Sequence, residues 1–158
     1  MFYVRLLINP DNYDFNRVLV SGYVDKTGTI SFINPLIDSE NAFLCIARPR
    51  SFGKSVALKT LIAYYSKGCD SKDIFSKYEI AHDPSFLEHL NQHNVIYWDM
   101  SSYGTPEADF DQFLKEFNKQ VIRELTYAYS DLFNGYQATD VIEALKHIKL
   151  TSNENLSF

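Results

Sequence analysis

The apolar residues of this chain fall into runs and spacings that predict both strands and helices. Two continuous apolar runs, residues 42–47 and 95–98, have the composition of strands buried on both faces of a parallel sheet. Between them, apolar residues at three- and four-residue steps predict an amphipathic helix over residues 54–65. The first run, the turn after it and this helix therefore form a strand–turn–helix unit.

Three further stretches have the spacing of helices. Apolar residues share one side of a helix over residues 30–36, over a long stretch that begins near Phe110, and over residues 140–148. Residues 2–8 are apolar enough for a short strand, although a turn sequence follows them directly. With 158 residues, 46% of them apolar, the chain is long enough to bury the core of one domain. We therefore expect a poorly defined segment over 1–14, one domain over 15–150 and a disordered tail over 151–158.

The turn between the first predicted strand and its helix has the features of a phosphate-binding loop. It reads Arg-Pro-Arg-Ser-Phe-Gly-Lys-Ser over residues 48–55. In such loops backbone N–H groups surround the phosphates, a lysine reaches the terminal ones and a hydroxyl holds Mg²⁺, roles that fit Lys54 and Ser55. The motif G-x-x-x-x-G-K-[ST] loses its first glycine at Arg48, and Pro49 has no N–H to donate. The alternative is a Gly-Lys-Ser helix start with a solvated lysine.

Three motifs, in this order, resemble those of the AAA-ATPase-like family of bacterial proteins. The first is Tyr-Val-Asp-Lys-Thr at residues 23–27, and the second is the loop itself, where Ser51 replaces the usual third arginine. The third is Ile-Phe at residues 74–75 followed by Asn-Val-Ile-Tyr-Trp-Asp-Met at residues 94–100. The likeness extends from about Phe15 to about Ile148, which is nearly the whole chain.

This resemblance implies an α/β fold of the P-loop NTPase type, with a three-layer arrangement of helices on both faces of a parallel sheet. The sheet would begin with strands 43–47 and 95–99 and would be incomplete at the C-terminus. The implied ligand is ATP with Mg²⁺. Lys54 is the predicted catalytic residue, because its ammonium would neutralise charge on the β- and γ-phosphates. The residues predicted to bind the nucleotide are Arg50, Ser51, Phe52, Gly53, Lys54, Ser55 and Val56.

Two residues are predicted to hold the metal ion, Ser55 directly and Asp99 at the end of the second apolar run. The alternative for Asp99 is an aspartate that hydrogen-bonds within the loop after its strand. In the family the Walker B acids lie further downstream, so we expect this chain to stop before the strand that carries them. Hydrolysis by this chain alone is then doubtful, because these acids orient Mg²⁺ and water. The PD-(D/E)xK nuclease-like domain that often follows in the family is absent, so nuclease activity is not expected.

A second hypothesis is a non-catalytic fragment or interaction module with a vestigial nucleotide site. Its partner would be a homologous ATPase subunit or the missing C-terminal half. The net charge of −5 gives no general attraction to nucleic acid. The one tight basic cluster, Arg48, Arg50, Lys54 and Lys59, is therefore assigned to nucleotide phosphates, and a DNA backbone is the alternative.

The remaining sequence features concern compartment and structural support. No apolar run of membrane-spanning length and no signal peptide is present, which favours a cytoplasmic protein. Cys45 and Cys69 are expected to be reduced thiols, with Cys45 buried in the first strand. Tyr23, Asp25 and Lys26 could bind adenine or ribose, pair with a loop arginine, or brace the fold, and we favour bracing.

Overall fold

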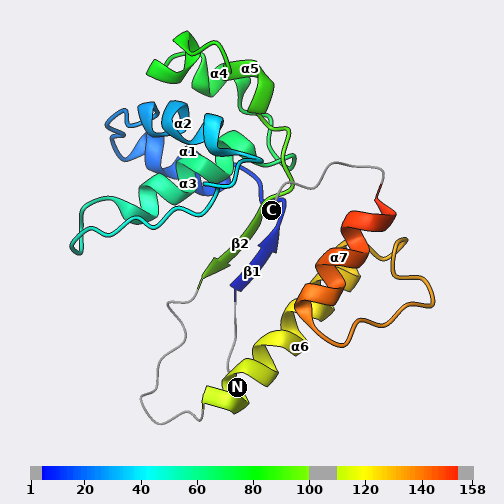
Figure 1. Cartoon of the computed structure of the whole chain (residues 1–158). Coiled ribbons are helices and arrows are strands. Elements are labelled where there is room, and N and C mark those ends of the chain that lie inside the picture. Colours follow the sequence, from blue (N-terminus) through cyan, green and yellow to red (C-terminus); the bar gives the residue numbers. More distant parts are fainter. Residues whose placement is uncertain (1–4, 100–109, 153–158) are drawn as a thin grey trace. The chain divides into compact units, whose positions relative to one another are not determined.

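A computed structural model describes residues 5–99 and 110–152 of the chain (Figure 1). The chain divides into two compact units, each with its own apolar core. One contains residues 9–95 and is called the loop unit here. The other contains residues 5–8, 96–99 and 110–152 among those described, and is called the sheet unit.

The sheet unit joins two strands and two helices. Strands β1 (Arg5–Ile8) and β2 (Ile96–Asp99) pair antiparallel, with Arg5 opposite Asp99 and Ile8 opposite Ile96. The helices are α6 (Phe110–Ala128) and α7 (Val141–Thr151), whose apolar faces meet a strand residue, Leu6, in one core. The buried members of this core are Leu6, Val121, Leu125, Phe133, Val141, Ala144 and Ile148.

The loop unit is helical. Its elements are α1 (Tyr13–Val20), α2 (Gly28–Ile33), the 3₁₀ turn η1 (Asn34–Leu36), α3 (Lys54–Tyr65), α4 (Lys72–Phe75), the 3₁₀ turn η2 (Glu79–His82) and α5 (Phe86–His89). Its core is rich in aromatic rings. Phe75 stacks on Phe15 with ring centroids 5.4 Å apart and meets Tyr64 edge-on at 5.3 Å. These arrangements are the ones that aromatic quadrupoles favour, so the core holds α1, α3 and α4 together.

Helix α3, which carries the candidate loop at its start, is fixed at its other end by Asn91. The Asn91 side-chain amide donates to the carbonyl oxygens of Ala63 (2.9 Å), Tyr64 (3.1 Å) and Ser66 (3.0 Å). Its oxygen accepts from the backbone N–H of Ser71 at 2.9 Å. Because the last carbonyls of a helix lack intrahelical partners, this contact anchors α3 within its unit.

The predicted helices are confirmed where the structure describes them. Helix α3 begins and ends at the residues that the apolar spacing predicts, and α2 with η1, α6 and α7 occupy the other predicted helical stretches. No helix in the two described ranges is long and apolar enough to cross a membrane.

The predicted three-layer α/β fold is wrong for the described residues. Their strands form one antiparallel pair and no parallel sheet. Strand 95–99 exists as β2, but its partner is β1. Residues 43–47 form neither strand nor helix, Phe43 is 95% exposed, and Cys45 is exposed and not buried as expected. An apolar run becomes a central strand only when neighbouring strands take its backbone hydrogen bonds and helices cover its faces. Among the described residues, no strand pairs with residues 43–47.

Candidate functional site

The bend before α3 places successive backbone groups in alternating conformations. Ser51 has φ +66° and Gly53, the N-cap of α3, has φ +78°, both in the left-handed region. Left-handed residues within a turn direct neighbouring N–H groups to one side and form the anion-binding concavity known as a nest. A serine rarely adopts this conformation, and such outliers gather at functional sites. The geometry therefore singles out residues 51–53.

The amides of this bend are free to receive a ligand. The N–H groups of residues 51–56 donate to no described residue, and the first hydrogen bond into α3 runs from the N–H of Ala57 to the carbonyl of Gly53 at 2.9 Å. Helix N-termini leave such donors unsatisfied and carry partial positive charge. The predicted amide donors, Ser51 to Ser55, thus have no competing acceptor among the described residues.

The Lys54 ammonium lies within the curve of the loop. Its Nζ donates to the carbonyl oxygen of Arg48 at 2.6 Å and to that of Pro49 at 2.8 Å. An ammonium group has three hydrogens, so one remains for another acceptor. The loop is therefore closed around the lysine, and the Lys54 side chain is still exposed to solvent.

The other predicted loop residues lie at the surface or at its edge. Arg50, Ser55 and Phe52 are exposed, and the side chains of Arg50 and Ser55 have no hydrogen-bond partner among the described residues. Val56 is half-buried and lines a small cavity with Lys26 from the segment before α2. The predicted set thus covers the bend, Arg50 to Gly53, and the first residues of α3, Lys54 to Val56.

Asp99 belongs to the other unit, at the end of β2. Its predicted role in holding Mg²⁺ with Ser55 depends on how the two units meet, and so it stays a prediction. Within residues 5–99 and 110–152, no three histidine, cysteine, aspartate or glutamate side chains cluster as metal ligands.

The Tyr-Val-Asp-Lys-Thr motif at residues 23–27 braces the loop unit. Asp25 accepts from the backbone N–H of Glu79 at 2.9 Å and from that of Thr27 at 2.8 Å, while Thr27 Oγ1 accepts from the N–H of Ile80 at 3.1 Å. Burial pushes the pKa of Asp25 up, but the hydrogen bonds from Glu79 and Thr27 outweigh it, so the pKa is lowered. The predicted bracing role therefore holds for Asp25, and Thr27, which the prediction did not include, takes part in the same brace.

Lys26 differs from its neighbours in the motif, since its side chain takes no part in the brace. A Cβ atom added at Gly53 would lie 3.4 Å from Lys26 Nζ. Lys26 therefore lies beside the candidate phosphate loop, although it precedes Gly53 by 27 positions in the chain. No periodicity or spacing signals such a contact.

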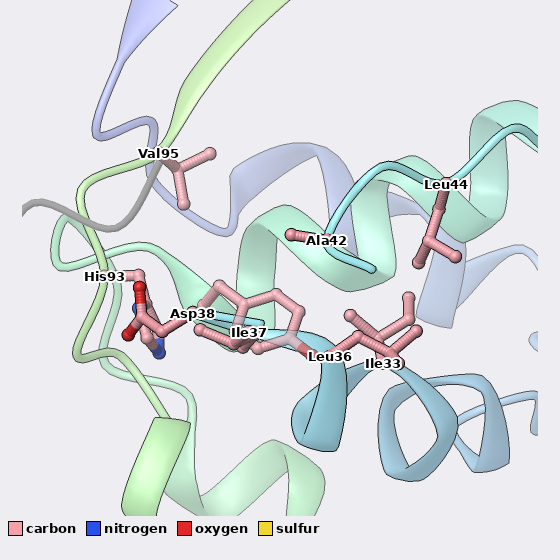
Figure 2. Close-up of a pocket in the computed structure, with 9 residues that line it drawn as sticks. Ile33, Leu36, Ile37, Asp38, Ala42, Leu44, His93 and Val95 are labelled. Atoms are coloured by element: carbon pink, nitrogen blue, oxygen red, sulfur yellow. The ribbon is translucent and has the colours of Figure 1, made fainter. Parts of the chain in front are cut away.

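A separate pocket of about 230 Å³ lies beside the segment that precedes the loop (Figure 2). Asp38 and His93 lie at one end of it and Leu44 at the other. Burial lowers the pKa of His93, and His89, whose Nδ1 lies 3.0 Å from His93 Nε2, lowers it further. The lining is Ile33, Leu36, Ile37, Asp38, Ala42, Leu44, Tyr65, His93 and Val95. This mostly apolar pocket contains none of the predicted phosphate-binding residues.

Comparison with known proteins gives one match. A family model described as a predicted AAA-ATPase matches residues 12–157. No curated protein and no solved structure matches the chain.

Proposed function

Because this chain belongs to the AAA-ATPase-like family of predicted AAA-ATPases, we propose that residues 50–56 bind the phosphates of a nucleoside triphosphate. ATP is the expected nucleotide and Mg²⁺ the expected ion. Nucleotide binding is the proposed activity.

One observation supports the proposal: amides of residues 51–56 without a described acceptor, and the Lys54 ammonium, occur together on the bend and the first turn of α3. Polyanionic phosphate is the ligand class that such donors suit best, because each oxygen accepts several charge-assisted hydrogen bonds. The missing first glycine of the motif matters less here, since Ser51 and Gly53 already supply the left-handed turns.

Each loop residue has a role in this proposal. The amides of Ser51 to Ser55 would cradle phosphate oxygens, and Lys54 would exchange its bonds to the Arg48 and Pro49 carbonyls for bonds to the triphosphate. Arg50, whose guanidinium has no described partner, would add an outer contact. Bound Mg²⁺ would neutralise phosphate charge, and the Ser55 hydroxyl is the group on this bend suited to hold it.

The test is a calorimetric titration of the whole chain with Mg-ATP. Lys54→Ala is expected to weaken binding about tenfold or more, because a charge-assisted contact contributes roughly 1.5–3 kcal/mol. Lys72→Ala, which removes an exposed lysine of α4 in the same unit, is the matched control and is expected to bind like the unaltered chain. Equal affinities of the two variants, or no saturable binding by the unaltered chain, would refute the proposal.

A second candidate function, an interaction module, is favoured by the segment before the loop. Phe43, Leu44 and Ile46 are 95%, 45% and 50% exposed, and the backbone of residues 43–47 donates to no described residue. An exposed apolar stretch with unpaired backbone N–H groups is suited to pairing with a strand of another ATPase-like chain. Phe43→Asp would then abolish a concentration-dependent increase in mass measured by analytical ultracentrifugation, and an unaltered sedimentation profile would contradict this role.

A further inference from the structure

We propose that Lys26 is a second phosphate-contacting residue, which supplies an ammonium group to the loop from outside the loop sequence. The inference rests on the proposed nucleotide site and adds to it a residue that its motif does not contain. The Tyr-Val-Asp-Lys-Thr motif would then have two functions, a brace and a ligand contact.

The position of Lys26 is the first support. Its Nζ lies next to Gly53, at 3.4 Å from where a Cβ atom would be, and its side chain lines a small cavity together with Val56 and Ala57 in the first turn of α3. Both the ammonium and the free amides of the bend therefore adjoin Gly53. A side chain at position 53 would enter the space between them.

The absence of a protein partner is the second support. The Lys26 ammonium forms no hydrogen bond or ion pair with any residue in the described ranges. The neighbouring carboxylate of Asp25 is already engaged by the amides of Glu79 and Thr27. The Glu79 carboxylate lies against Gly28, where its Oε2 would be 3.1 Å from an added Cβ.

The local charge is the third support. Lys26 and Lys54 both lie near the start of α3, which carries partial positive charge of its own. An anion bound near this helix N-terminus would therefore meet both the partial charge of the helix and nearby ammonium groups. A phosphate chain, with several negative oxygens, can contact both ammonium groups.

The backbone of Lys26 is held while its side chain stays available. The Lys26 N–H donates to the Tyr23 hydroxyl at 3.3 Å, and its carbonyl accepts from the N–H of Thr29 at 3.1 Å. Asp25 and Thr27, on either side, are tied to η2. This arrangement fixes the backbone from which the Lys26 side chain extends, so only the side chain itself loses freedom when a ligand binds.

The experiment compares the Mg-ATP affinity of the full chain carrying Lys26→Met, Lys26→Arg or the control Lys72→Met, which alters an exposed lysine of α4. Lys26→Met keeps most of the stem and removes the charge, and it is expected to weaken binding about tenfold. Lys26→Arg is expected to restore most of the affinity, a rescue that a purely structural role of the side chain would not require. The affinity of Lys26→Met should also depend less on ionic strength, because one phosphate contact is lost.

The outcomes separate this inference from the proposed function. If Lys54→Ala weakens Mg-ATP binding while Lys26→Met binds like Lys72→Met, the nucleotide site stands and the role of Lys26 is refuted. If the unaltered chain does not bind Mg-ATP, both proposals are refuted. Thermal unfolding of each variant shows whether it is folded, and Lys26→Gln replaces Lys26→Met if that variant is not. An affinity of Lys26→Arg no better than that of Lys26→Met would also contradict a phosphate contact.

Discussion

Thr27 offers a sharp test of the brace that supports the candidate site. Both Thr27 and Ile80 are fully buried, and the N–H of Ile80 donates to Thr27 Oγ1 at 3.1 Å. Thr27→Val keeps the shape of the side chain but removes the acceptor. A buried N–H without an acceptor costs about 1–3 kcal/mol, so the free energy of unfolding should fall by about this amount.

Thr60→Val is the matched control for this change. Thr60 is also buried, but its hydroxyl donates to the carbonyl of Val56, one turn earlier in α3, at 2.9 Å. That carbonyl keeps its helical hydrogen bond when the hydroxyl is lost, and threonine bonds of this type stabilise helices little. The expected change in the free energy of unfolding is therefore within about 0.5 kcal/mol.

Urea denaturation followed by circular dichroism measures both variants, and amide hydrogen exchange reports on Ile80 directly. Thr27→Val should unfold at lower urea than Thr60→Val and should exchange its Ile80 amide proton faster. If the two variants unfold together and protection of the Ile80 amide is unchanged, the brace does not depend on this hydrogen bond.

Two further predictions concern the loop glycine and a carboxylate in the sheet unit. Gly53→Ala and Gly135→Ala both place a side chain at φ +78°, so each should cost about 1–2 kcal/mol of stability, but only Gly53→Ala should also weaken Mg-ATP binding in calorimetry. Hydrogen bonds from the Thr139 side chain first, and then from Tyr136, lower the pKa of Glu143 from 4.5 to about 2. Its contribution to stability is then complete above about pH 4.5 and is lost as the pH falls toward 2. Glu143→Gln should therefore reduce the loss of stability over this acid range in urea titrations, and an unchanged pH dependence would contradict the assignment.

The candidate loop could be located from sequence because its signals are local. The Gly-Lys-Ser turn and the apolar spacing after it predict both the bend and helix α3, and the structure has α3 at Lys54–Tyr65. Helices α6 and α7 could be predicted for the same reason, since a helix makes its hydrogen bonds within four residues. The family follows from motifs of this kind, and the match to residues 12–157 confirms it.

The strands could not be paired from sequence. Residues 43–47 and 95–98 have similar apolar runs, yet only the second contributes to a strand, because β1 supplies the hydrogen bonds for β2. An apolar run indicates that burial is favourable, but it does not indicate which distant segment will cover it. The prediction of a parallel sheet was wrong for this reason.

By itself, the chain's order of residues determined the helices, the family and the chemical character of the loop, since each depends on neighbours within a few positions. Tertiary structure alone decided that β2 pairs with β1 and that the Lys26 ammonium lies beside Gly53. Both contacts join residues far apart in the chain. Their formation depends on how whole elements pack, a property that no short stretch of sequence contains.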